Sequence, residues 1–140
     1  MDVETVRAKM QAQVETARTS ALARAFGWSF EVDGLTVYVT LAPRRHREPV
    51  YLLRVAFDDF PSRAPSYVFV DAATKQMTDG AWPPGVRHGG PPPGICTPGT
   101  REFHEHLHRG DNQYPWDPDR YTFLSTLTEI HRMSERAIGA

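Results

Sequence analysis

The amino-acid sequence predicts a single α+β domain that spans residues 1–140. Apolar residues recur every three or four positions near both ends of the chain, a spacing typical of amphipathic helices. Between residues 28 and 70 the spacing changes to alternation, which is typical of half-buried strands. A glycine- and proline-rich stretch, residues 80–99, then predicts a long irregular loop. A chain of 140 residues is long enough for one sizeable core and too short for two ordinary domains.

The N-terminal half of the domain is expected to be one helix followed by a sheet. The helix should run from about Val3 to Phe26 and end at Gly27. Strands are expected at residues 28–32, 35–41, 50–57 and 66–70, with Asp33-Gly34 as the first hairpin turn. Because four consecutive strands with short connections favour an antiparallel meander, we expect that topology, with the helix covering one face.

The single cysteine, Cys96, lies near the end of the 80–99 loop, in the string Gly94-Ile95-Cys96-Thr97-Pro98-Gly99. A lone cysteine cannot form an internal disulfide; it is a small buried residue, a metal ligand or a nucleophile. The neighbouring glycines and prolines can hold an irregular backbone close to a ligand. This location favours chemistry over packing.

A short helix is expected over residues 100–108, with Thr100 as its cap and Glu102 near its positive end. It carries three of the six histidines of the chain. At α-helical spacing His104 and His108 share one face, and Glu102 and His106 share another. Histidine and glutamate side chains gathered in this way could serve either as proton acceptors or as metal ligands.

A final helix is expected from about Asp119 to Ile138, after a polar loop that contains Trp116-Asp117-Pro118. Its inward side chains should be Tyr121, Leu124, Leu127, Ile130 and Met133. The complete order is helix, four strands, loop with cysteine, short helix, loop and helix.

Composition and charge exclude several classes of function. The formal net charge is -1, from 16 basic and 17 acidic side chains, so no general attraction to nucleic acid or anionic lipid is expected. No stretch approaches 18 consecutive apolar residues, and the N-terminus lacks the features of a signal peptide. We therefore expect a cytoplasmic protein that binds neither nucleic acid nor membrane.

Three strings in this order resemble the ubiquitin-conjugating (E2, UBC-like) fold. The segment from Phe60 to Phe69, Phe-Pro-Ser-Arg-Ala-Pro-Ser-Tyr-Val-Phe, is similar to the turn and strand "YPxxPPxvxF" of that family. Gly94-Ile95-Cys96 is similar to the "GxIC" that carries the active-site cysteine, and Trp116-Asp117-Pro118 is similar to "WxP". The resemblance covers roughly residues 3–135 and is greatest to divergent prokaryotic members, which are encoded beside ubiquitin-like proteins and adenylating enzymes, some of them in antiphage defence operons.

The sequence also departs from the family pattern. His88-Gly89-Gly90 stands where eukaryotic members have His-Pro-Asn, so the asparagine that supports the oxyanion is missing. The histidine-rich segment is an insertion, and the last two helices of the family are absent. A small bacterial E2-like family with a predicted metal-binding signature of one Cys, one Glu and two His is similar in order to Cys96, Glu102 and two of the three clustered histidines.

The resemblance implies a conjugating enzyme that needs no cofactor. Cys96 would accept a ubiquitin-like protein from an E1-like adenylating enzyme as a thioester and pass it to an amine of a target protein. A thiolate is required for this attack. His104 or His88 would favour the thiolate or take a proton from the amine, and Glu102 or Glu105 would orient that base.

Two other functions are compatible with the sequence. Zinc accepts cysteine sulfur, histidine nitrogen and carboxylate oxygen, usually four in a tetrahedron. Cys96, Glu102, His104 and His108 supply these ligand types, which would make the domain a structural or interaction module. The third function is an inactive UBC-like interaction domain without a metal.

Overall fold

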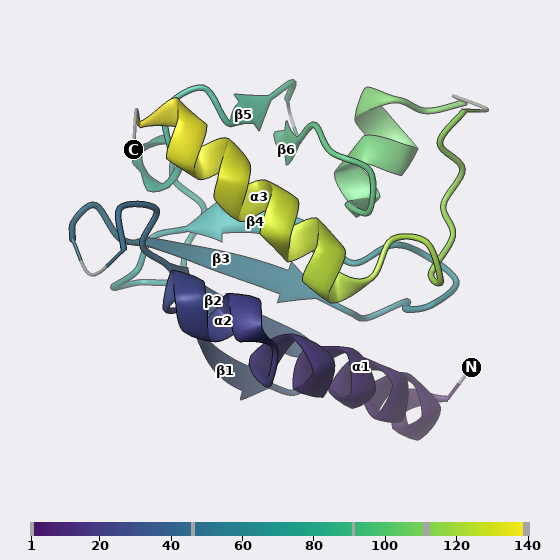
Figure 1. Cartoon of the computed structure of the whole chain (residues 1–140). Coiled ribbons are helices and arrows are strands. Elements are labelled where there is room, and N and C mark those ends of the chain that lie inside the picture. The colour runs from purple at the N-terminus through teal and green to yellow at the C-terminus, as the bar shows by residue number, and fades with distance from the viewer. Residues whose placement is uncertain (1, 46, 91, 111–112, 139–140) are drawn as a thin grey trace.

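The computed structural model of the chain describes residues 2–45, 47–90, 92–110 and 113–138. It confirms the mixed α+β architecture, with helices at both ends of the chain and a four-stranded antiparallel sheet between them (Figure 1). No helix in these ranges is both long and apolar enough to cross a membrane.

The N-terminal segment forms two helices, α1 (Val3–Arg18) and α2 (Ala21–Phe26), so the expectation of one continuous helix is wrong. The break lies at Thr19 and Ser20, whose hydroxyl groups bond the backbone. Thr19 Oγ1 donates to the Glu15 carbonyl at 2.7 Å, and Ser20 Oγ accepts the Ala23 N–H at 3.1 Å. These side chains end one helix and cap the next. Gly27, with a positive φ of 71°, ends α2 as predicted.

The four expected strands are present as β1 (Ser29–Asp33), β2 (Thr36–Leu41), β3 (Tyr51–Ala56) and β4 (Ser66–Val70). They pair in sequence order, which confirms the antiparallel meander. One face of the sheet carries two buried cross-strand rows, whose members are Val37, Val55 and Tyr67, and Val39, Leu53 and Phe69. This face forms the centre of the core.

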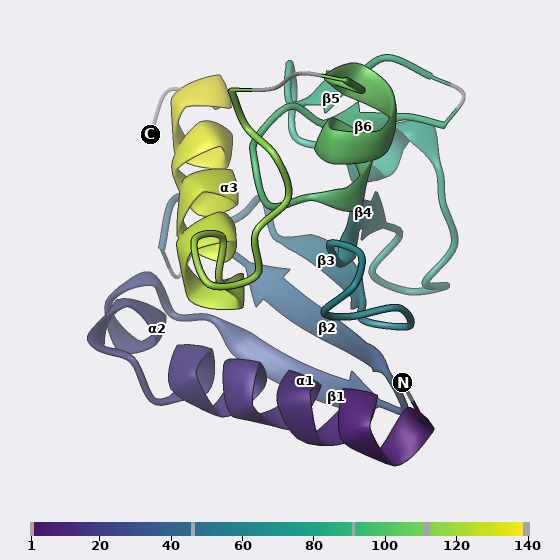
Figure 2. The ribbon, with the colours of Figure 1, turned by 90° about the vertical axis from the view of Figure 1, so that its right-hand side faces the viewer.

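Helices α1 and α3 (Phe123–Ala137) cover that buried face, with α1 along β1 and α3 along β3 and β4 (Figures 1 and 2). The last helix begins at Phe123 rather than near Asp119, because Thr122 Oγ1 caps it through the Ser125 N–H at 3.1 Å. Leu127 and Ile130 are buried as expected, whereas Tyr121, Leu124 and Met133 are only half-buried. His131 is an additional, fully buried member of this face.

The glycine- and proline-rich segment packs against the core at three points. It contains a short 3-10 helix, η1 (Asp79–Ala81), and two paired two-residue strands, β5 (Arg87–His88) and β6 (Gly94–Ile95). Trp82, Val86 and Ile95 from this segment are buried in the core. The loop is therefore held by apolar anchors, and Cys96 follows the last of them.

Candidate functional site

The thiol of Cys96 lies beside the imidazole of His108, with 3.4 Å between Sγ and Nε2. Cys96 is half-buried, and His108 is exposed. The His108 ring stacks on the buried ring of Phe103, with centroids 4.3 Å apart and planes inclined by 22°. A stacked ring has few alternative rotamers, so this packing holds the imidazole close to the sulfur.

A π-helical turn, η2 (Phe103–Leu107), brings His108 to this position. The sequence predicts an α-helix over residues 100–108, but the N–H of His108 donates to the carbonyl of Phe103, five residues earlier, at 2.8 Å. The wider turn stacks residue 108 on residue 103. The expected cap is confirmed, because Thr100 Oγ1 accepts the Phe103 N–H at 3.1 Å.

The thiol loop, residues 96–100, joins β6 to the π-helical turn, and His104 is hydrogen-bonded to its backbone. Its Nε2 accepts the Gly99 N–H at 3.0 Å, and the ring packs against Trp116 and Tyr121. Burial lowers the pKa of His104 below its usual value, although a hydrogen bond with the Tyr114 backbone opposes this shift. A neutral ring whose Nε2 already accepts a hydrogen bond supports the loop rather than acting on the thiol.

Gly99 is the point where the thiol loop contacts the last helix. Its φ of 106° is a conformation that residues with a side chain rarely adopt, and a Cβ at this position would collide with the Thr126 side chain of α3. Gly99 therefore allows the loop to lie directly on α3.

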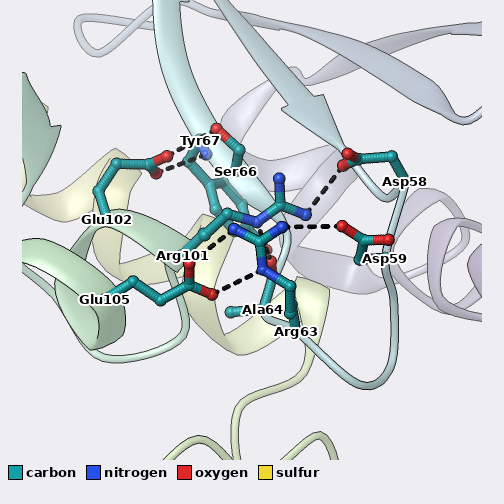
Figure 3. Close-up of polar contacts among 9 residues, drawn as sticks. All are labelled: Asp58, Asp59, Arg63, Ala64, Ser66, Tyr67, Arg101, Glu102 and Glu105. Carbon is teal, nitrogen blue, oxygen red and sulfur yellow. Dashed lines mark hydrogen bonds and ion pairs between the residues drawn. The ribbon is translucent and has the colours of Figure 1, made fainter. Parts of the chain in front are cut away.

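Glu102 anchors the π-helical turn to the sheet (Figure 3). Its side chain is buried, and its two oxygens accept hydrogen bonds from Ser66 Oγ at 2.6 Å and from the Tyr67 N–H at 3.0 Å. At Gly94 in β6 a Cβ would lie 2.5 Å from the Glu102 Cβ, so only glycine fits there. Glu102 therefore bonds the turn to β4 through its carboxylate and lies against β6 through its side-chain carbon atoms.

Two arginines tie the same turn to the connection between β3 and β4 (Figure 3). Arg101 pairs with Asp58 at 2.8 Å and also donates to the Ala64 carbonyl at 3.0 Å. Arg63 pairs with Glu105 at 2.6 Å and with Asp59 at 2.8 Å. The hydrogen bond from Arg101 lowers the pKa of Asp58, and the one from Arg63 lowers the pKa of Glu105.

No pattern in the sequence indicated these two arginines as part of the site. Arg63 and Glu105 are 42 residues apart, and Arg101 and Asp58 are 43 apart. Partners so distant are brought together only by the tertiary fold, and the chain carries arginines throughout its length. Glu105 was expected to orient a base, whereas its carboxylate faces Arg63.

His88 is exposed in β5, in register with Gly94 of β6. The strand that directly precedes Cys96 is β6, and the Cys96 thiol lies within hydrogen-bonding distance of His108. His104 and His88 were expected to support catalysis, but the ring in contact with the Cys96 sulfur is that of neither residue. The structure assigns that position to His108, which the sequence associated only with metal binding.

A cavity of about 260 Å³ is lined by the π-helical turn, the connection between β3 and β4, and the loop that contains Trp116. Its wall is partly aromatic and partly charged; it includes Arg63, His104, Glu105, His108, Tyr114 and Trp116. The Trp116 indole donates to the Pro61 carbonyl at 2.8 Å, which fixes one wall. The His108 ring therefore contacts the thiol and also lines this cavity.

The side chains expected to bind zinc do not converge on one point. Glu102 and His104 use their acceptor atoms for Ser66, Tyr67 and Gly99, which leaves Cys96 and His108 as a pair. Within residues 2–45, 47–90, 92–110 and 113–138, no three His, Cys, Asp or Glu side chains are grouped as a metal site requires. The arrangement does not fit the predicted four-ligand centre.

Comparison with known proteins returned no matching family model and no similar curated protein.

Proposed function

We propose that this protein is an E2-like conjugating enzyme of a bacterial ubiquitin-like modification system, of the kind encoded in some antiphage defence operons. Cys96 accepts the C-terminal carboxyl group of a ubiquitin-like protein from an E1-like adenylating enzyme and transfers it to an amine of a target protein. The proposal combines the resemblance of three sequence strings with the surroundings of the thiol.

The single observation that carries this proposal is the 3.4 Å contact between Cys96 Sγ and His108 Nε2. A thiol must lose its proton to attack a carbonyl carbon, and an adjacent imidazole can accept that proton. Cys96 is half-buried near the end of a loop, so the residue is partly accessible from outside the core. Cysteine next to histidine is an arrangement typical of nucleophilic catalysis.

The reaction has two steps. In the first, Cys96 Sγ attacks the carbonyl carbon of the thioester carried by the adenylating enzyme; a new C–S bond forms and the thiol of that enzyme leaves. In the second, the target amine attacks the same carbon, a C–N bond forms, and the Cys96 thiolate leaves. His108 takes the proton released by the amine in the second step.

Hydrogen bonds and ion pairs around the π-helical turn hold the Cys96 and His108 side chains in a fixed position. Glu102 bonds the turn to β4 and Thr100 caps it, while Arg63 and Arg101 form ion pairs between the turn and the connection between β3 and β4. Interactions that fix the geometry of reacting groups lower the entropic cost of reaching the transition state. A network of polar side chains around a half-buried thiol is expected of an active site and not of a cysteine used for packing.

The direct test mixes the purified protein with its E1-like enzyme, ATP and ubiquitin-like protein, followed by non-reducing electrophoresis. We expect an adduct that dithiothreitol removes and that Cys96→Ala lacks. His108→Ala should slow transfer to an amine, whereas His106→Ala, an exposed histidine on the same turn, should leave it unchanged.

The alternative functions give different results in the same preparation. Absence of the adduct, together with stoichiometric zinc that is lost in Cys96→Ala, would identify a metal-binding module and refute the enzyme. Absence of both adduct and zinc would indicate an inactive interaction domain.

A further inference from the structure

The first strand of the sheet has an open edge. In the part of the chain that the structure describes, β1 pairs with β2 alone. Its residues alternate between two faces: Phe30 and Val32 pair with buried Val39 and Val37 on the core face, and Glu31 and Asp33 lie on the opposite face. Unpaired N–H and C=O groups along such an edge form a template for another strand.

An apolar groove runs beside this edge, between α1 and β1. It has a volume of about 570 Å³, and all of its strand residues come from β1; its wall includes Met10, Val14, Glu15, Arg18, Phe30 and Val32. Val32 is 50% exposed, although it lies on the face that forms the core further along the sheet. A strand added next to β1 would place every second side chain over this groove.

Charge on the other face of β1 limits the occupant. Glu31 and Asp33 both lie there, and Lys75 pairs with Glu31 at 2.8 Å. Full-length antiparallel pairing of β1 with a second copy would place Glu31 opposite itself, and like charges directly opposite destabilise a sheet. Basic side chains at alternate positions would instead complement Asp33 and join Lys75 beside Glu31, since one lysine faces two carboxylates on this side of the strand.

We propose that β1 binds an extended peptide that alternates apolar and basic residues, as a fifth strand of the sheet. Its apolar side chains enter the groove between α1 and β1, and its basic side chains face Glu31 and Asp33. Main-chain hydrogen bonds supply affinity, and the alternation supplies specificity. The site lies on β1, away from Cys96, and does not depend on the proposed conjugating activity.

The test uses a fluorescein-labelled heptapeptide of alternating leucine and lysine, with fluorescence anisotropy as the readout. We expect saturable binding with one peptide per chain and slower hydrogen exchange of the β1 amides. Val32→Asp should weaken binding at least about tenfold, which corresponds to about 1.4 kcal/mol. Val3→Asp is the matched control, because Val3 is 56% exposed and does not line the groove.

Two further peptides distinguish specific binding at β1 from nonspecific binding to the protein surface. A heptapeptide of alternating leucine and glutamate, and one with the leucines and lysines of the first peptide in blocks, should both bind at least about tenfold more weakly. Equal binding of either peptide, or equal loss in Val3→Asp and Val32→Asp, would overturn the proposal. A dimer in sedimentation that Val32→Asp dissociates would also overturn it, in favour of self-association through β1.

Discussion

Acidification between pH 7 and pH 5 should destabilise this protein through one buried histidine, His131. The ring is fully buried in α3 and stacks on Phe26 with centroids 4.0 Å apart. Its Nδ1 accepts the indole N–H of Trp28 at 3.0 Å, so the neutral form is required for this bond. Burial, together with the charges of Arg45 and Arg132, lowers the pKa of His131 from 6.5 to about 4.

The two pKa values give the size and direction of the effect. The unfolded chain gains a proton near pH 6.5, while the folded chain does so only near the lowered pKa, which is about 4. The stability that the neutral ring contributes is therefore complete above pH 6.5 and is lost as the pH falls. About 2 kcal/mol is lost by pH 5, and about 3 kcal/mol below pH 4. For a chain of this length, 2 kcal/mol lowers the melting temperature by roughly 8 °C.

Thermal unfolding followed by circular dichroism between pH 7 and pH 5 measures this loss. His131→Gln keeps an acceptor for Trp28 and cannot be protonated, so its melting temperature should fall much less over the same range. His104 also has a lowered pKa and acts in the same direction in both proteins, so the difference between the two curves isolates His131. Equal pH slopes in the two proteins, or titration of the His131 ring signal above pH 6 in NMR spectra, would refute the reasoning.

Three further predictions concern the loop and turn around the thiol. His108→Ala should slow alkylation of Cys96 by iodoacetamide at pH 7 by roughly tenfold or more, while His88→Ala leaves the rate unchanged; the rates are followed by mass spectrometry. Gly99→Ala should destabilise the fold by more than about 2 kcal/mol in urea unfolding, because its positive φ and its contact with α3 leave no space for a methyl group. Glu102→Ala leaves two donors of β4 without their acceptor and should cost roughly 2–4 kcal/mol in the same assay.

The parts of the fold that could be predicted from the sequence are those set by local spacing. Alternation along β2 and β3 and the Asp33-Gly34 turn specify a meander, since the side-chain period fixes which face is buried. The break between α1 and α2 was missed, although Thr19 and Ser20 carry the relevant signal. An apolar period continues through them, and only their hydroxyl bonds to the backbone interrupt the helix.

The site was predicted less completely, because its geometry depends on contacts between distant segments. Cys96 could be singled out from its loop, but the choice among the clustered histidines could not be made from α-helical spacing. The π-helical turn changes which ring faces the sulfur. That turn is fixed from outside, by Glu102 on β4 and by the bond between His104 and Gly99.

The polar residues of the turn have different roles, which follow from the hydrogen bonds that each side chain makes. Residue type alone made Glu102 and His104 candidates for chemistry, yet both oxygens of the buried Glu102 carboxylate accept hydrogen bonds from β4 and so link the turn to the sheet. His104 likewise uses Nε2 for the loop backbone. The exposed His108 ring, by contrast, meets the only thiol of the chain at 3.4 Å. Glu102 and His104 therefore support the turn and the loop. We expect any chemistry at this place to involve Cys96 and His108.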